Sequence, residues 1–156
     1  MSLEVIIGNN QQATEIPESW LTALESVAHE AARLALENAA DEDCPLSHLA
    51  TLEVAIVDDE TSDQVHRDFM NIEGATDVIT FHHGEIVIGA GVAERQAAEY
   101  DEPLARELLR YFVHGLLHLA GHEDEDSNDR ATMEAAQESI IAKLWTTDLR
   151  ERLGSF

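Results

Sequence analysis

Four residues in the run HGLLHLAGHED have types and spacings that suit a metal site. His114 and His118 stand four positions apart, so on a helix their imidazoles share one face and can converge on one ion. Gly121 follows, and glycine is the residue that most readily ends a helix in a left-handed turn. The chain can then fold back and present Asp124 as a third ligand. Two histidines and a carboxylate suit Zn²⁺, with a fourth position open to water.

The third ligand has a rival in His122, because imidazole is the commoner ligand type. If the helix continued through Gly121, His122 would be rotated about 80° from His114, near the limit of convergence. The spacing therefore favours Asp124. The plain alternative to a metal site is a helix that carries two ordinary, partly buried histidines.

Other positions near the pair narrow the chemistry. Zinc proteases with the HExxH motif place a glutamate directly after the first histidine as general base, and here that position is Gly115. A protease of that kind is therefore disfavoured. A hydrolase could still use a zinc-bound water, whose pKa falls to about 7, against a phosphodiester. Glu107 and Tyr111 share the helix face of His114 and are either supporting groups or ordinary helix residues.

Hydrophobic periodicity predicts the elements that must position these residues. The helix opened by Pro103 carries its leucines on one side, so that His114 and His118 lie beside the apolar stripe. Strands come mostly first and helices mostly last, which predicts an α+β domain with a small mixed sheet and several helices. The expected strands are 3–8, 52–58, 77–81 and 85–90, and a tight hairpin at His82, His83 and Gly84 joins the last two. Two helices are expected over 60–70 and 92–100. Three more are expected to begin at Pro17 as first helical residue, at Pro103, and after a cap at Ser127 or Asn128.

Composition bounds the class of protein. The length of 156 residues predicts one domain, 1–156, and the lone Cys44 together with the lack of a signal peptide or an apolar membrane-length run predicts a cytoplasmic protein without membrane contact. The net charge of -23, from 32 acidic and 9 basic residues, argues against DNA or RNA as a partner. A surface adapted for solubility in a salty cell is the alternative explanation of this charge.

Several segments nevertheless match one known pattern. Besides HGLLHLAG, residues 76–81 read TDVITF and residues 84–88 read GEIVI, similar to the family sequences TDVLSF and GDIVI. With these motifs the chain resembles the YbeY family of rRNA maturation factors, from about position 52 to 144. Further matching positions are Gln96, Ala97, Tyr100, Glu107, Met133, Gln137, Glu138 and Ile140.

The resemblance implies a zincin-like α+β fold with the metal on a long helix in the C-terminal half. It implies a Zn²⁺-dependent endoribonuclease that cleaves single-stranded RNA, with roles in 16S rRNA 3′-end maturation and ribosome quality control. The implied partners are rRNA and the small ribosomal subunit with its associated factors. In this interpretation His114, His118 and Asp124 hold the metal, with His122 as the alternative third ligand, and Arg67, Thr80 and His114 are the catalytic residues. A metal-binding assembly factor with weak or lost nuclease activity is the alternative function.

The chain also departs from the family pattern. Asp124 stands at the family's third metal histidine, and His122 at its usual tyrosine. An arginine that the family uses toward substrate phosphate falls on Met70, and Arg67, one helical turn earlier, is either its substitute or an unrelated surface residue. Thr80 replaces a family serine and keeps a hydroxyl. His82 and His83 sit in a connection shorter than the family's, and a polar turn is the favoured interpretation of them, with the metal cleft as the alternative.

Overall fold

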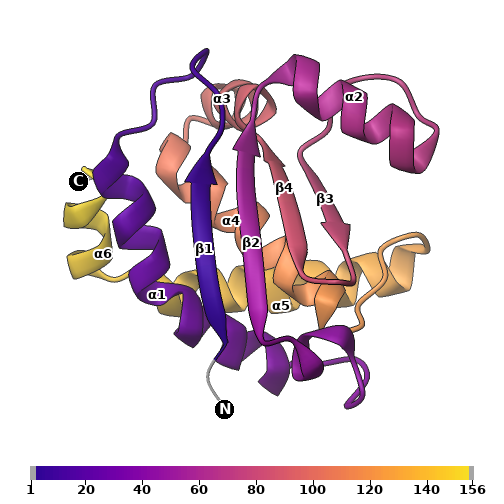
Figure 1. Ribbon diagram of the computed structural model, residues 1–156. Coiled ribbons are helices and arrows are strands. Elements are labelled where there is room, and N and C mark those ends of the chain that lie inside the picture. The colour runs from indigo at the N-terminus through magenta and orange to yellow at the C-terminus, as the bar shows by residue number, and fades with distance from the viewer. Residues whose placement is uncertain (1–2, 155–156) are drawn as a thin grey trace.

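The computed structural model describes residues 3–154 and has an α+β architecture, as the sequence predicts. Figure 1 shows a four-stranded sheet with the long helices α1, α4 and α5 behind it. The strands are β1 (Glu4–Asn9), β2 (Thr51–Val57), β3 (Val78–Phe81) and β4 (Glu85–Gly89). The helices are α1 (Glu18–Glu37), α2 (Asp59–Met70), α3 (Ala90–Glu99), α4 (Leu104–Leu119), α5 (Ser127–Leu144) and α6 (Thr147–Arg152), with a short 3₁₀ turn η1 (Pro45–His48).

The sheet is mixed, in the order β1-β2-β4-β3. β1, β2 and β4 run parallel, and β3 pairs antiparallel with β4. The predicted hairpin between β3 and β4 is confirmed: the amide of Gly84 donates to the carbonyl oxygen of Phe81 at 3.0 Å. Gly84 has φ of +109°, a conformation that glycine adopts without strain. The hairpin places β3 at one edge of the sheet.

Alternation along the strands divides the sheet into two faces. Ile86 and Ile88 of β4 belong to the main core with the helices α1 and α4, whereas Val87 belongs to a small second cluster. Val65 of α2 packs against that second cluster. The sheet therefore has one face buried under long helices and one face covered in part by α2.

α4 is the central helix of the main core and approaches β4 closely. Its buried side chains occupy much of its circumference, and they include Leu108, Leu109, Phe112 and Leu116. A Cβ atom added to Gly115 would lie only 2.8 Å from Cδ1 of Ile86. The position that bears a glutamate in HExxH proteases is thus pressed against the sheet, and it has no room for a side chain directed to the metal ligands.

Several helix ends differ from the predictions. Pro17 and Pro103 were predicted to open their helices as helical residues. Each is instead the N-cap, with an extended backbone, and the helices begin one residue later, at Glu18 and Leu104. The prediction of Ser127 or Asn128 as the cap of α5 is wrong, because the carboxylate of Asp126 accepts the capping hydrogen bond from the amide of Asp129 at 2.8 Å. α6 has no counterpart among the predicted helices. Within residues 3–154, no helix is both long and apolar enough to cross a membrane.

Candidate metal centre

The chain turns sharply at the end of α4, as the glycine predicts. Gly121 has φ of +94°, and its amide donates to the carbonyl oxygen of His118 at 3.0 Å. The amide of His122 donates to the carbonyl oxygen of Leu117 at 3.0 Å. These two hydrogen bonds are those of a Schellman motif, which satisfies carbonyls at the helix end. The reversal brings Asp124 back over the last turn of α4.

Three ligand atoms meet at this turn. The Nε2 atoms of His114 and His118 lie 3.1 Å apart, and Oδ2 of Asp124 lies 3.5 Å from each of them. Atoms bound to one tetrahedral zinc at about 2.0–2.2 Å are themselves about 3.3–3.6 Å apart. These three residues form the only such group of potential ligands among residues 3–154. The donor set of two imidazoles and a carboxylate thus fits a metal ion.

The hydrogen bonds on the far side of each ring direct the ligand atoms. Nδ1 of His118 lies 3.0 Å from the carbonyl oxygen of His122, and Nδ1 of His114 lies 2.8 Å from Oε1 of Gln137. Both partners are acceptors, so each Nδ1 carries the proton and each Nε2 presents a lone pair. Two lone pairs 3.1 Å apart repel one another, and a cation between them removes this repulsion. The geometry therefore favours an ion at the centre.

Burial also favours the metal-binding form of His118. The pKa of the His118 imidazole lies below its ordinary value, mainly because burial disfavours the charged ring and secondly because a charge on the neighbouring His114 would repel it. A histidine must be neutral to coordinate a metal. The lowered pKa keeps this ring neutral at physiological pH.

The side chain of His122 is engaged elsewhere. It is buried, and its Nε2 lies 2.6 Å from the carbonyl oxygen of Asn38 at the end of α1. The structure brings Asp124, and not the imidazole of His122, together with the two histidines of α4. His122 supports the centre through its backbone carbonyl, which accepts from His118.

The three ligand atoms open into a cleft of about 570 Å³ between α2, β3, α4 and the start of α5. Thr80 lines this cleft, and its buried Oγ1 has no hydrogen-bond partner among the described residues. His82 lines the cleft as well, whereas His83 pairs with Glu85. Arg67 is not among the lining residues: its guanidinium pairs with Asp63 of its own helix at 2.8 Å. Of the two residues expected to assist catalysis beside the ligands, Thr80 is thus at the cleft and Arg67 is not.

Acidic side chains dominate the charge of the cleft. Arg130 is the one arginine or lysine that lines it within residues 3–154. Its guanidinium donates to the backbone carbonyl of Asp124 at 3.2 Å and so braces the turn that carries this ligand. The acidic residues of the lining are Asp77, Glu123, Asp124, Glu125 and Glu134.

Comparisons with known proteins place the chain in a family. The family model described as "Endoribonuclease YbeY" matches residues 6–145. The chain belongs to the YbeY family. It is 33% identical over 159 residues to "Endoribonuclease YbeY" of Moorella thermoacetica, covering 90% of this chain and 96% of that protein. It is 31% identical to the protein of the same name from Symbiobacterium thermophilum, over 91% of this chain and 97% of that one.

The fold is shared with a solved structure. The solution structure of TM1509 from Thermotoga maritima matches 92% of this chain and 89% of its own, with a TM-score of 0.56 and 24% sequence identity. At that identity the likeness supports the fold alone. It agrees with the α+β architecture that the YbeY resemblance implies.

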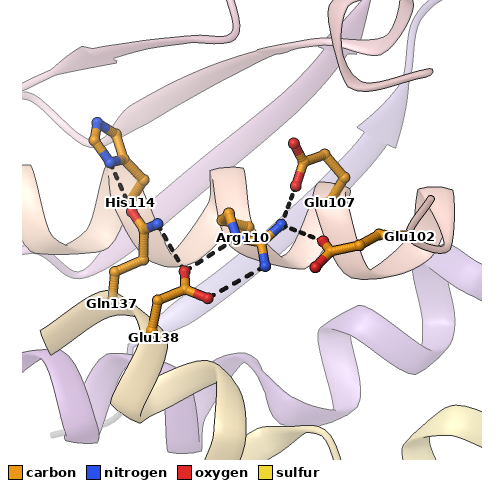
Figure 2. A network of polar contacts seen from close by, with 6 residues as sticks. All are labelled: Glu102, Glu107, Arg110, His114, Gln137 and Glu138. Carbon is orange, nitrogen blue, oxygen red and sulfur yellow. Dashed lines mark hydrogen bonds and ion pairs between the residues drawn. The ribbon is translucent and has the colours of Figure 1, made fainter. Parts of the chain in front are cut away.

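No site role was predicted for Gln137 and Glu138, which lie behind His114. Figure 2 shows Gln137 and Glu138 of α5 reaching α4, where Arg110 contacts Glu138, Glu102 and Glu107. Glu107 is buried in this network, which excludes the ordinary surface role left open for it. A signal for Gln137 was present: it interrupts the apolar stripe of α5 four residues after Met133. A buried glutamine in such a stripe needs partners, and they lie on another helix.

The charged side chain of Arg110 is largely buried. Burial opposes the charge, but hydrogen bonds to Glu138, Glu102 and Glu107 outweigh it and raise the pKa of the guanidinium. Burial likewise opposes the charge of Glu138, and hydrogen bonds from Arg110 and Gln137 nevertheless hold the pKa of this carboxyl below its ordinary value. Glu138 is therefore an ionised acceptor at neutral pH.

Proposed function

We propose that this YbeY-family protein is a Zn²⁺-dependent endoribonuclease of single-stranded RNA that acts in 16S rRNA 3′-end maturation and ribosome quality control. The observation that carries the proposal is the convergence of His114, His118 and Asp124 at the floor of a cleft, in a family whose members are named endoribonucleases. In this proposal residues 1–156 form one hydrolase domain. It works in the cytoplasm on rRNA and the small ribosomal subunit with its associated factors.

Each residue of the centre has a role in this proposal. His114, His118 and Asp124 would hold the zinc, and Arg130 steadies the Asp124 backbone. A bound zinc ion acidifies water and offsets negative charge at a phosphate oxygen. Thr80 lines the cleft, and its buried, unpartnered hydroxyl would have to turn outward to donate a hydrogen bond to a phosphate oxygen there. A catalytic role for Arg67 at the phosphate stays a prediction: its guanidinium is paired with Asp63 and would have to leave that pair to enter the cleft.

Aromatic rings beside the cleft supply a way to hold RNA without many cations. Phe69 is 67% exposed and meets Phe81 edge to face, with ring centroids 5.1 Å apart, and His83 stacks on Phe81. Phe69 and Phe81 are chain neighbours of Met70 and His82, which line the cleft. Unpaired bases stack on such rings, whereas paired bases are hidden in a duplex. This surface suits a single-stranded substrate.

RNA cleavage by matched variants tests the function. We expect the zinc-loaded wild-type protein to cut a single-stranded rRNA 3′-end oligonucleotide internally, and the same strand in a duplex to resist. His118→Ala should lose this cleavage. His48→Ala should keep it, because His48 is an exposed histidine of η1 that does not line the cleft. Equal cleavage by His118→Ala and wild type would refute the proposed centre.

A second candidate is a metal-binding assembly factor with weak or lost nuclease activity. The acidic cleft, in which Arg130 is the one arginine among the described residues, and Met70 at its wall favour this alternative, because little positive charge is present to offset that of the phosphates. It predicts co-sedimentation of the protein with 30S subunits while the oligonucleotide stays intact.

A further inference from the structure

Gln137 has an amide whose orientation is set by its neighbours. The side chain is buried at the contact of α5 with α4. Its Nε2 lies 3.1 Å from a carboxylate oxygen of Glu138, and an ionised carboxylate only accepts hydrogen bonds. The amide nitrogen must therefore face Glu138, which leaves Oε1 to face Nδ1 of His114 at 2.8 Å. Because Oε1 also only accepts, Nδ1 of His114 must donate.

Arg110 fixes Glu138 in turn. Its Nε and one terminal nitrogen donate to the two carboxylate oxygens of Glu138 at 3.0 and 3.2 Å. The other terminal nitrogen donates to Glu102 at 2.8 Å and to Glu107. Figure 2 shows this chain of contacts running from Glu102 to His114. The side chain of Arg110 is only 18% exposed, whereas that of Glu138 is 49% exposed, so water reaches this pair mainly from the Glu138 side.

The two histidines of the centre differ in what holds them. The Nδ1 partner of His118 is a backbone carbonyl, which no side-chain substitution removes. The Nδ1 partner of His114 is a side chain that depends on two further side chains. Only the tautomer and direction of His114 should thus respond to mutations in α5.

We propose that Gln137, oriented by Glu138 and Arg110, is a positioning residue that holds His114 in the Nδ1–H tautomer with Nε2 directed at the metal centre. The proposal rests on the proposed function for the identity of the metal, but the tautomer of His114 is a property of the metal-free protein. Outer partners of this kind change metal affinity by about 10–100-fold when they are removed.

Long-range ¹H–¹⁵N NMR of the histidine rings in metal-free protein tests the proposal. We expect His114 and His118 both to show the Nδ1–H tautomer in wild type. Gln137→Met keeps the volume but removes the acceptor, so the His114 signals should shift toward the Nε2–H form while those of His118 stay. Gln137→Glu restores an acceptor and should restore Nδ1–H. Gln64→Met, the same substitution at an exposed position on α2, should change neither ring.

Zinc affinity, measured by competition with a chromophoric chelator, provides the second readout. Gln137→Met should weaken zinc binding about 10–100-fold, and Gln64→Met should leave it unchanged. Glu138→Gln frees the amide of Gln137 to rotate, so it should give a mixed His114 tautomer and an intermediate affinity; it carries the test if Gln137→Met does not fold. Wild-type tautomer in folded Gln137→Met and Glu138→Gln would overturn the proposal. If wild type bound no zinc, the proposed function would fail, and the NMR result would still decide the role of Gln137.

Discussion

Asp124 owes its place at the centre to the turn that precedes it. Gly121 reverses the chain, and the carboxylate then lies 3.5 Å from both imidazoles, while the ring of His122 faces Asn38. We predict that Asp124→Ala lowers zinc affinity at least about 10-fold, since one of three ligands is lost.

His122→Ala is the matched control for this prediction. It should keep the metal, because its backbone carbonyl still accepts from His118. It should instead destabilise the fold by about 1–3 kcal/mol, since the hydrogen bond between the buried His122 ring and Asn38 is lost. Zinc titration and urea unfolding of both variants check this pair of outcomes. Loss of zinc in His122→Ala with retention in Asp124→Ala would reverse the assignment.

At this scale the sequence predicted what lies close along one helix. The spacing of His114 and His118 defines a shared face without any tertiary knowledge. Asp124 was preferred because glycine predicts the reversal, and the structure places it with the pair. The positioning role of Gln137 depends on how α5 lies against α4, and no local pattern encodes that contact. Arg67 failed to reach the cleft because a carboxylate four residues earlier on its own helix holds it.

At the scale of elements, the contact of α4 with β4 at Gly115 sets how deeply the metal helix sits. We predict that Gly115→Ala destabilises the protein by about 1–2 kcal/mol, because overpacking against buried Ile86 exceeds the gain in helix propensity. Urea unfolding measures the loss. Ile86→Val removes Cδ1, the nearest atom, and should recover part of the loss in the double variant. An alanine that stabilises the protein would show that α4 is free to move off the sheet.

The edge formed by α2 and β3 carries the exposed rings assigned to RNA binding. We predict that Phe69→Ala weakens binding of a single-stranded oligonucleotide about 5- to 150-fold, the range for loss of one stacking contact of about 1–3 kcal/mol. Fluorescence anisotropy on the His118→Ala background, which avoids cleavage, measures this effect. Tyr100→Ala is the control, since Tyr100 is equally exposed but lies at the end of α3, where neither it nor its chain neighbours line the cleft. An abasic strand should bind both variants alike, and a Phe69 effect that persists with it would exclude stacking.

The elements themselves were largely predictable, because alternation in strands and apolar stripes in helices are local properties. Their ends were less so. Asp126, Ser127 and Asn128 are all of residue types that cap helices, so the sequence does not choose between them. The backbone conformation makes Asp126 the cap of α5. α6 is only six residues long, and it depends on burial of Leu149 in the core. Such a helix has too few turns to show a period in the sequence.

For the whole molecule, the charge of -23 is a cost to the folded state. The described carboxylates pair with few arginines, and most acidic side chains face water. We predict that the melting temperature rises between 10 mM and 500 mM NaCl, because salt screens the repulsion. For a chain of this size each 1 kcal/mol regained corresponds to about 2–4 °C. A scan by differential calorimetry checks the trend, and a melting temperature that falls with salt would contradict it.

The same charge should make RNA affinity depend weakly on salt, since few phosphates can meet a cation here. The molecule would then rely on its metal, its aromatic rings and protein partners on the small ribosomal subunit to bind its substrate. The cleavage chemistry itself is assigned to the metal centre.

The decisive experiment is titration of metal-free protein with zinc, in which bound metal and cleavage of the single-stranded 3′-end oligonucleotide are measured together. We predict that cleavage appears with the first zinc, rises in proportion to occupancy and levels off at one equivalent per chain, and that Asp124→Ala needs more zinc for the same rate. Cleavage that is complete without metal, or that ignores occupancy of this site, would contradict it.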